Sequence, residues 1–192
     1  MALTPLQAVS ALLFRLCPRR HVEGVPIVFM DFDIDRDMSV ARMAAIFETL
    51  RQVDERYLAT VKRYVRHVAI WKGHYTASDK IGGVQLASSW LMDSSDLLLA
   101  SVFVHEATHL RVRRYGIKYN ADMRSRIERL CVKQQAGFLR KVHDGGEDLA
   151  ALYEEALESP WWTDQAHQAD VEKLVSDIDI PRWLVPLLHR RS

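Results

Sequence analysis

Residues 97–116 decide the fold, and they read LLLASVFVHEATHLRVRRYG. The pattern predicts one helix over residues 97–115, because capping side chains at 93–95 precede it and Gly116 follows it. The turns before His105 are apolar on most sides, which is typical of a helix that runs through the middle of a domain. We therefore expect this helix to be buried and to carry the functional residues.

The centre of this helix contains an HExxH motif. His105 and His109 lie four residues apart, so their imidazoles project from nearly the same face and can share one tetrahedral metal ion. Glu106 would face the fourth coordination position, where a carboxylate can accept a proton from zinc-bound water. The motif predicts one zinc per chain, with Glu106 as the catalytic base. The alternative is a pair of core histidines satisfied by backbone carbonyls.

A third ligand is expected on the following helix, which Asn120 would cap. Glu128 lies about two turns into that helix, and a short connector would bring the two antiparallel helices together at this height. Asp122 is the main rival ligand. Cys131 shares a helical face with Glu128 through i, i+3 spacing and could approach the site, although a cysteine of this kind is more often simply buried.

The motif and its spacing resemble those of the gluzincins, zinc metallopeptidases of the zincin superfamily whose third ligand is a glutamate on the downstream helix. Here 18 residues separate His109 from Glu128, as in the aminopeptidase branch of that family. The resemblance covers about residues 68–142. It implies that His105, His109 and Glu128 bind zinc and that Glu106 is the general base.

The resemblance also has an implication for substrate binding. It suggests that residues 82–86 form the edge strand of the sheet, which would line the cleft and pair with an extended peptide. Aminopeptidase specificity is not implied, because the chain is much smaller than those enzymes and no exopeptidase motif precedes the helix.

Periodicity along the rest of the chain predicts an α+β, zincin-like fold. A small twisted sheet in the N-terminal half would pack on the HExxH helix, and a mostly helical C-terminal half would follow. We expect residues 1–192 to form a single zincin-like metal-binding domain. The predicted strands are 27–35, 68–71 and 84–86, and the other predicted helices are 3–16, 39–67 (in two parts, broken near Asp54), 120–142, 147–158 and 164–176, with a short apolar turn at 181–188.

Composition limits the partners and the compartment. The net charge of +1 gives no reason to expect a nucleic-acid partner. The apolar run at 3–16 is too short to span a bilayer and lacks the features of a signal peptide, so no stable membrane insertion is expected. Cys17 and Cys131 form no CxxC pair, which favours a reducing compartment and a cytoplasmic protein.

Charge is unevenly placed in the second half of the chain. A basic stretch covers residues 111–141, and an almost wholly acidic stretch covers 144–179. We interpret them as solvated helical faces that attract one another in the fold rather than as a binding patch.

The sequence thus predicts a zinc-dependent hydrolase, a metallopeptidase that cleaves a peptide or protein substrate with zinc-bound water activated by Glu106. The alternative is a non-catalytic zincin-like module that binds a protein partner. An open metal position beside a groove would favour the enzyme, and a fourth protein ligand such as Cys131 would favour the module. The sequence leaves the oligomeric state open and does not choose an oxyanion donor among Tyr75, Tyr115, Tyr119, His143, Tyr153 and His167.

Overall fold

The computed structural model describes residues 16–73, 77–78, 82–142 and 145–158. The segments predicted at 164–176 and 181–188, and the predicted helix at 3–16 apart from its last residue, lie outside this part of the chain. In chain order the elements are β1 (Arg19–Val22), β2 (Val25–Phe29), α2 (Arg36–Val53), α3 (Glu55–Tyr64), β3 (Val68–Trp71), β4 (Ala77–Ser78), β5 (Val84–Ala87), α4 (Ser88–Asp93), α5 (Asp96–Arg114), α6 (Ala121–Leu139) and α7 (Gly146–Ala156).

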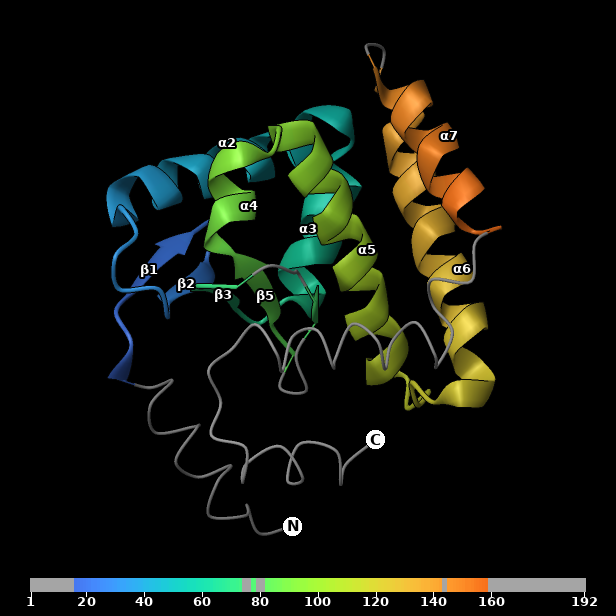
Figure 1. The fold of residues 1–192 in the computed structure, drawn as a ribbon, viewed down its shortest axis with the longest axis horizontal. Coiled ribbons are helices and arrows are strands. Elements are labelled where there is room, and N and C mark those ends of the chain that lie inside the picture. The colour runs from blue at the N-terminus through green and yellow to red at the C-terminus, as the bar shows by residue number, and fades with distance from the viewer. Residues whose placement is uncertain (1–15, 74–76, 79–81, 143–144, 159–192) are drawn as a thin grey trace, which may run out of the picture.

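The fold is α+β, as the periodicity predicts, with the sheet in the N-terminal half and helices making up most of the described C-terminal half (Figure 1). The sheet has the strand order β1-β2-β3-β5-β4. Its three central strands are parallel, and β1 and β4 pair antiparallel at its two edges. Helices α2 and α3 form the crossover between β2 and β3, which a parallel pair requires.

Two expectations about the strands are wrong. The segment at 19–22, for which no strand was predicted, is strand β1, joined to β2 by a two-residue turn in which both Glu23 and Gly24 have positive φ. Such a turn matches the twist of a hairpin. The strand predicted over 27–35 ends at Phe29, because the carboxylate of Asp31 accepts a hydrogen bond from the backbone of Asp33 (3.1 Å) and so forms a local turn.

The edge strand of the sheet also differs from the expectation. Residues 82–86 were expected to form it, but β5 is interior and pairs with β3 on one side and β4 on the other. The last strand in the sheet order is therefore the two-residue β4, which was not among the predicted strands. The short helix α4 after β5 was not predicted.

The predicted break near Asp54 is confirmed. Its backbone N–H donates to Leu50 at the end of α2, and its side chain accepts from the backbone of Arg56 in the first turn of α3. One residue therefore ends one helix and begins the next.

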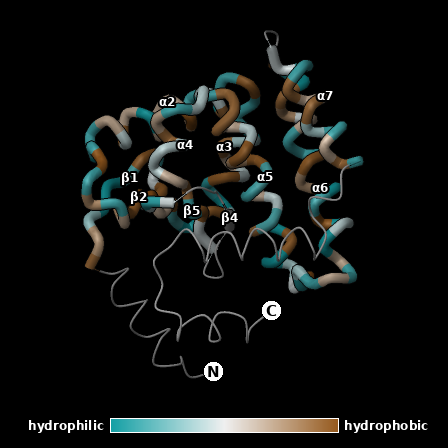
Figure 2. Tube along the Cα trace, in the orientation of Figure 1, coloured by the Kyte–Doolittle hydropathy of each residue, from teal (hydrophilic) through white to brown (hydrophobic). Residues whose placement is uncertain are grey.

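The core lies between the sheet and the helices. Helix α5 packs against α2 and α3 on one side and against α6 on the other, with α7 beyond α6 (Figure 1). Phe47 of α2 and Phe103 of α5 meet edge to face with ring centroids 5.7 Å apart. The same cluster of buried residues reaches Phe138 on α6 and Ala150 on α7. Along α6 and α7, hydrophobic and hydrophilic positions alternate, as expected for helices with one buried face (Figure 2).

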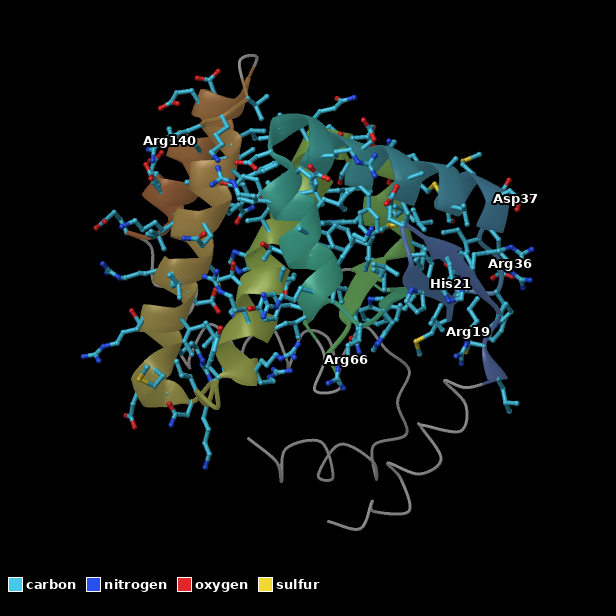
Figure 3. The ribbon with its side chains drawn as sticks, turned by 180° about the vertical axis from the view of Figure 1, so that it is seen from behind. Arg19, His21, Arg36, Asp37, Arg66 and Arg140 are labelled. Atoms are coloured by element: carbon cyan, nitrogen blue, oxygen red, sulfur yellow. The ribbon has the colours of Figure 1, made fainter. Side chains whose placement is uncertain are left out.

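Charged side chains gather at the periphery. Arg19, His21, Arg36 and Asp37 surround β1 and the start of α2, and Arg140 lies at the opposite end of the molecule (Figure 3). Arg140 forms ion pairs with Glu147 and Glu154 on α7. This contact confirms, at that point, the expected attraction between the basic and acidic stretches. Among the described residues, no helix combines the length and apolar character needed to cross a membrane.

Candidate metal centre

Helix α5 presents the two histidines as predicted. Ser95 caps it by accepting a hydrogen bond from the backbone of Leu98 (3.2 Å), and Gly116 follows it with a φ of 79°. The side chains of His105 and His109 are only 14% and 13% exposed. Their Nε2 atoms face each other at 3.1 Å. The helix therefore directs the ring nitrogens of both residues to one point.

Helix α6 brings Glu128 to the same point. Asn120 caps this helix by accepting from the backbone of Met123 (3.1 Å), as expected. Glu128 is buried, and its two carboxylate oxygens lie 3.4 Å from Nε2 of His105 and 3.4 Å from Nε2 of His109. The predicted juxtaposition of Glu128 with the histidine pair is confirmed.

The spacing of these donors can be compared with the needs of a metal ion. Nitrogen or oxygen ligands at the usual zinc distances, arranged tetrahedrally, stand about 3.3–3.4 Å from one another. The two Nε2 atoms are 3.1 Å apart, and each lies 3.4 Å from a different oxygen of Glu128, Oε2 for His105 and Oε1 for His109. Each nitrogen thus has a neighbouring donor at the spacing of two ligands on one small tetrahedral ion.

Cys131 is a further donor at the site. Its Sγ and one ring nitrogen each of His105 and His109 all lie within 4.8 Å of one another, so these three residues form a group that could hold a metal ion. Cys131 is fully buried in a small cluster with Val112 and Ile127. Burial, together with the nearby charges of Glu128 and Glu106, raises the pKa of the Cys131 thiol.

The loop between α5 and α6 supports Glu128. Tyr119 donates its hydroxyl hydrogen to a carboxylate oxygen of Glu128 at 2.5 Å, and its ring meets that of His109 edge to face. Burial alone would raise the pKa of Glu128, but hydrogen bonds from His105, His109 and Tyr119 outweigh it and hold this pKa well below the usual range. Glu128 is therefore ionised at neutral pH.

The remaining predicted residues fall into two groups. Glu106 is buried at 7% exposure, and its negative charge contributes to the raised pKa of His105, where it acts with Glu128 against the opposing effect of burial. The carboxylate of Glu106 is thus close enough to His105 to affect its pKa. Asp122, the rival ligand, is exposed in the first turn of α6, whereas Glu128 is at the histidines.

The oxyanion-donor candidates separate in the same way. Tyr119 is at the site, and Tyr115 is 72% exposed at the end of α5. Burial raises the pKa of Tyr153 on α7, against the opposing effect of its interactions with Gln135 and Ser101. Tyr75, His143 and His167 lie outside the described residues.

Sequence reasoning missed two residues. Gln135 accepts a hydrogen bond at Oε1 from Nδ1 of His105 (3.0 Å), and its Nε2 donates to Ser101 Oγ (3.0 Å). Their spacing contained a signal, because Ser101 precedes His105 by one helical turn and Gln135 follows Cys131 by one turn. A search of each helix for buried polar residues in line with the ligands would have found both.

We compared the chain with protein-family models, with curated proteins and with solved structures, and none of the three comparisons found a match.

Proposed function

We propose that the chain is a zinc-dependent hydrolase that cleaves peptide bonds, with a zincin-like arrangement of its site. The observation that supports it best is the spacing of the donor atoms of His105, His109 and Glu128, which suits zinc and leaves one tetrahedral position for water or substrate. Two histidines and a glutamate with one open position are the ligand pattern of catalytic rather than structural zinc.

Zinc bound there would supply a Lewis acid that acidifies water and polarises a carbonyl. The chain's own residues have separate tasks around it. Glu106, next to His105 on the same buried helix, accepts the proton from the attacking water and returns it to the leaving amine. Tyr119 fixes the carboxylate of Glu128, so that the ligand does not have to be ordered when the ion binds.

The sheet offers a place for an extended substrate. β4 is the last strand in the sheet order, and it contacts α5, the helix that carries the histidines. A peptide that paired with the outer edge of β4 would be aligned with this helix. This assigns to β4 the substrate-binding role that the sequence suggested for 82–86.

Cleavage of a diverse peptide pool tests the proposal, read by mass spectrometry for the wild type and for Glu106→Gln. The variant keeps the size and hydrogen-bonding capacity of the side chain but removes its basicity. We expect equal zinc content in both proteins and a fall in turnover of about 100-fold or more in the variant. Equal cleavage by both proteins would remove Glu106 from the mechanism, and no cleavage by zinc-loaded wild type would contradict the peptidase assignment.

One observation favours a second function. Cys131 lies in the same group as the two histidines, and as a fourth ligand it would close the site. The protein would then be a non-catalytic module in which zinc fastens α5 to α6 and another surface binds a protein partner. This alternative predicts bound zinc with a thiolate ligand and no cleavage of any peptide.

A further inference from the structure

Two buried polar side chains, Gln135 and Ser101, form a hydrogen-bonded chain that ends at Nδ1 of His105, the ring nitrogen that does not face Glu128. Gln135 is only 1% exposed, and Ser101 is fully buried. They connect α6 to α5 one helical turn before the motif and are not themselves candidate ligands. A buried amide is costly when its polar atoms lack hydrogen-bond partners, and one that is fully hydrogen-bonded is held in a single orientation by those partners.

The hydrogen-bond directions fix that orientation. The hydroxyl of Ser101 donates to the carbonyl of Leu98 (2.7 Å), so its oxygen is left to accept a hydrogen bond. It does so from Nε2 of Gln135, which places Oε1 of Gln135 against Nδ1 of His105. An acceptor at that position requires a hydrogen on Nδ1. In the neutral imidazole the lone pair is then on Nε2, the atom that faces Glu128.

The reverse orientation of the amide is unfavourable at both ends. It would place Oε1 of Gln135 against the oxygen of Ser101, whose hydrogen is already used by Leu98. It would also place an amide donor against Nδ1 of His105 and move the ring hydrogen to Nε2. That tautomer has no lone pair to offer at the site.

Helix α7 also supports the Gln135 amide. The side chain of Tyr153 on α7 interacts with both Gln135 and Ser101. α7 packs along α6. The orientation of the Gln135 amide is therefore supported from α5, α6 and α7 together.

We propose that Gln135 is the positioning residue of the metal site: it holds His105 in the tautomer and ring orientation that direct Nε2 to the ion, and Ser101 and Tyr153 hold Gln135. The role rests on the metal site of the proposed function. It does not depend on whether the site is catalytic. Loss of such a partner of a metal-binding histidine typically weakens metal affinity about 10–100-fold.

Three variants test the proposal through zinc affinity measured by chelator competition. Gln135→Met keeps the side-chain length and removes both amide groups, and we expect zinc to bind about 10–100-fold more weakly. Gln135→Glu keeps the acceptor for Nδ1 but loses the donor to Ser101, so it should recover only part of that loss. Gln134→Met is the matched control, since Gln134 is the neighbouring glutamine on α6, and it should bind zinc as the wild type does. Wild-type affinity in a folded Gln135→Met would overturn the proposal.

A second measurement separates this proposal from the metal assignment, because it needs no zinc. Long-range ¹H–¹⁵N NMR correlations report the tautomer of His105 in metal-free protein that carries Glu128→Ala, so that no carboxylate faces Nε2, at a pH where the ring is neutral. We expect Nδ1–H in this background alone and with Gln134→Met, and a mixture of tautomers with Gln135→Met. If Gln135→Met does not fold, Ser101→Ala replaces it. This variant removes the acceptor that fixes the Gln135 amide, so a mixture of His105 tautomers is again expected. Nδ1–H in every folded variant would overturn the role of Gln135 even if zinc binds, whereas the expected tautomers without zinc binding would refute only the metal site.

Discussion

Glu128 and Cys131 lie one turn apart on α6, and both side chains reach the same pair of imidazoles on α5. The carboxylate oxygens are 3.4 Å from the two Nε2 atoms, a distance typical of two ligands on one ion. For Cys131 the corresponding separations are within 4.8 Å. The geometry thus favours Glu128 as the third ligand and leaves Cys131 as the residue that would distinguish a closed site from an open one.

Substitution of the two residues should therefore have unequal effects. We expect Glu128→Ala to weaken zinc binding by more than about 100-fold, a larger loss than that of a supporting residue, and Cys131→Ser to change it less than about 10-fold. The cobalt-substituted protein should lack a sulfur-to-metal charge-transfer band. A band that is present in the wild type and absent in Cys131→Ser would instead identify a thiolate ligand and support the module.

Asp122 gives a control on the same helix. It is exposed in the first turn of α6, away from the histidines, so Asp122→Ala should leave zinc affinity within about twofold of the wild type. Chelator competition, run together with Glu128→Ala, checks the order of the two effects. A greater loss for Asp122→Ala would transfer the ligand role to it.

Tyr119 should contribute to affinity through its hydroxyl group alone. Tyr119→Phe removes the 2.5 Å hydrogen bond to Glu128 but keeps the ring against His109. We expect zinc binding about 10–100-fold weaker, with the fold unchanged. Tyr115→Phe, on an exposed side chain of the same loop region, should have no effect on affinity. Equal affinity in all three proteins would show that Tyr119 does not support the ligand.

The sequence predicted the centre of the site because helical spacing determines it. An HExxH pattern places two imidazoles on one face wherever the helix forms, and the capping residues Ser95 and Asn120 mark where both helices begin. Glu128 could then be placed by counting turns. Gln135 lies one turn after Cys131 and so in line with the ligands, but it was missed because its role depends on a contact between α5 and α6 that the sequence does not show.

The strands were less predictable, for a physical reason. β1 is a short edge strand with three of its four side chains exposed, and β4 has only two residues, so their hydrophobic pattern is weak and their pairing depends on the neighbouring strands. The opposite error occurred after Phe29. There the alternation of polar and apolar residues imitates a strand, but the side chain of Asp31 accepts a hydrogen bond from the backbone N–H of Asp33.

A pH-dependent contribution to stability is expected at Asp54, outside the site. Hydrogen bonds from Arg56 and Lys141 hold the pKa of Asp54 well below its usual value. A lowered pKa in the folded state stabilises the fold above the unfolded-state pKa of about 3.9, and this contribution is lost as the pH falls through the folded-state value. Asp54→Asn keeps the helix cap but removes the charge, so it should lower the Tm at pH 7 and have a smaller effect below about pH 4.

Thermal melts over a pH series check this expectation. In a Lys141→Met background the effect of Asp54→Asn at pH 7 should be smaller, because one of the two cations is already gone. A loss of Tm that is the same at every pH would show that the ion pairs do not contribute.

Zinc should also stabilise the protein as a whole. An ion that binds only the folded state adds about 2.7 kcal/mol when its free concentration is about 100 times its Kd. For a chain of this length that corresponds to a rise in Tm of roughly 5–10 °C. His105→Ala should abolish the shift, whereas Glu106→Gln should preserve it, since Glu106 is not a ligand. A zinc-dependent shift of equal size in His105→Ala would show that the ion binds elsewhere.

Anomalous scattering at the zinc absorption edge, from crystals of the zinc-loaded protein, tests the central claim most directly because it shows the metal and its ligands together. We predict one peak per chain, bonded to Nε2 of His105, Nε2 of His109 and the carboxylate of Glu128, with one position left for a water molecule. The absence of a peak between α5 and α6, or a peak that these histidines do not coordinate, would contradict the claim.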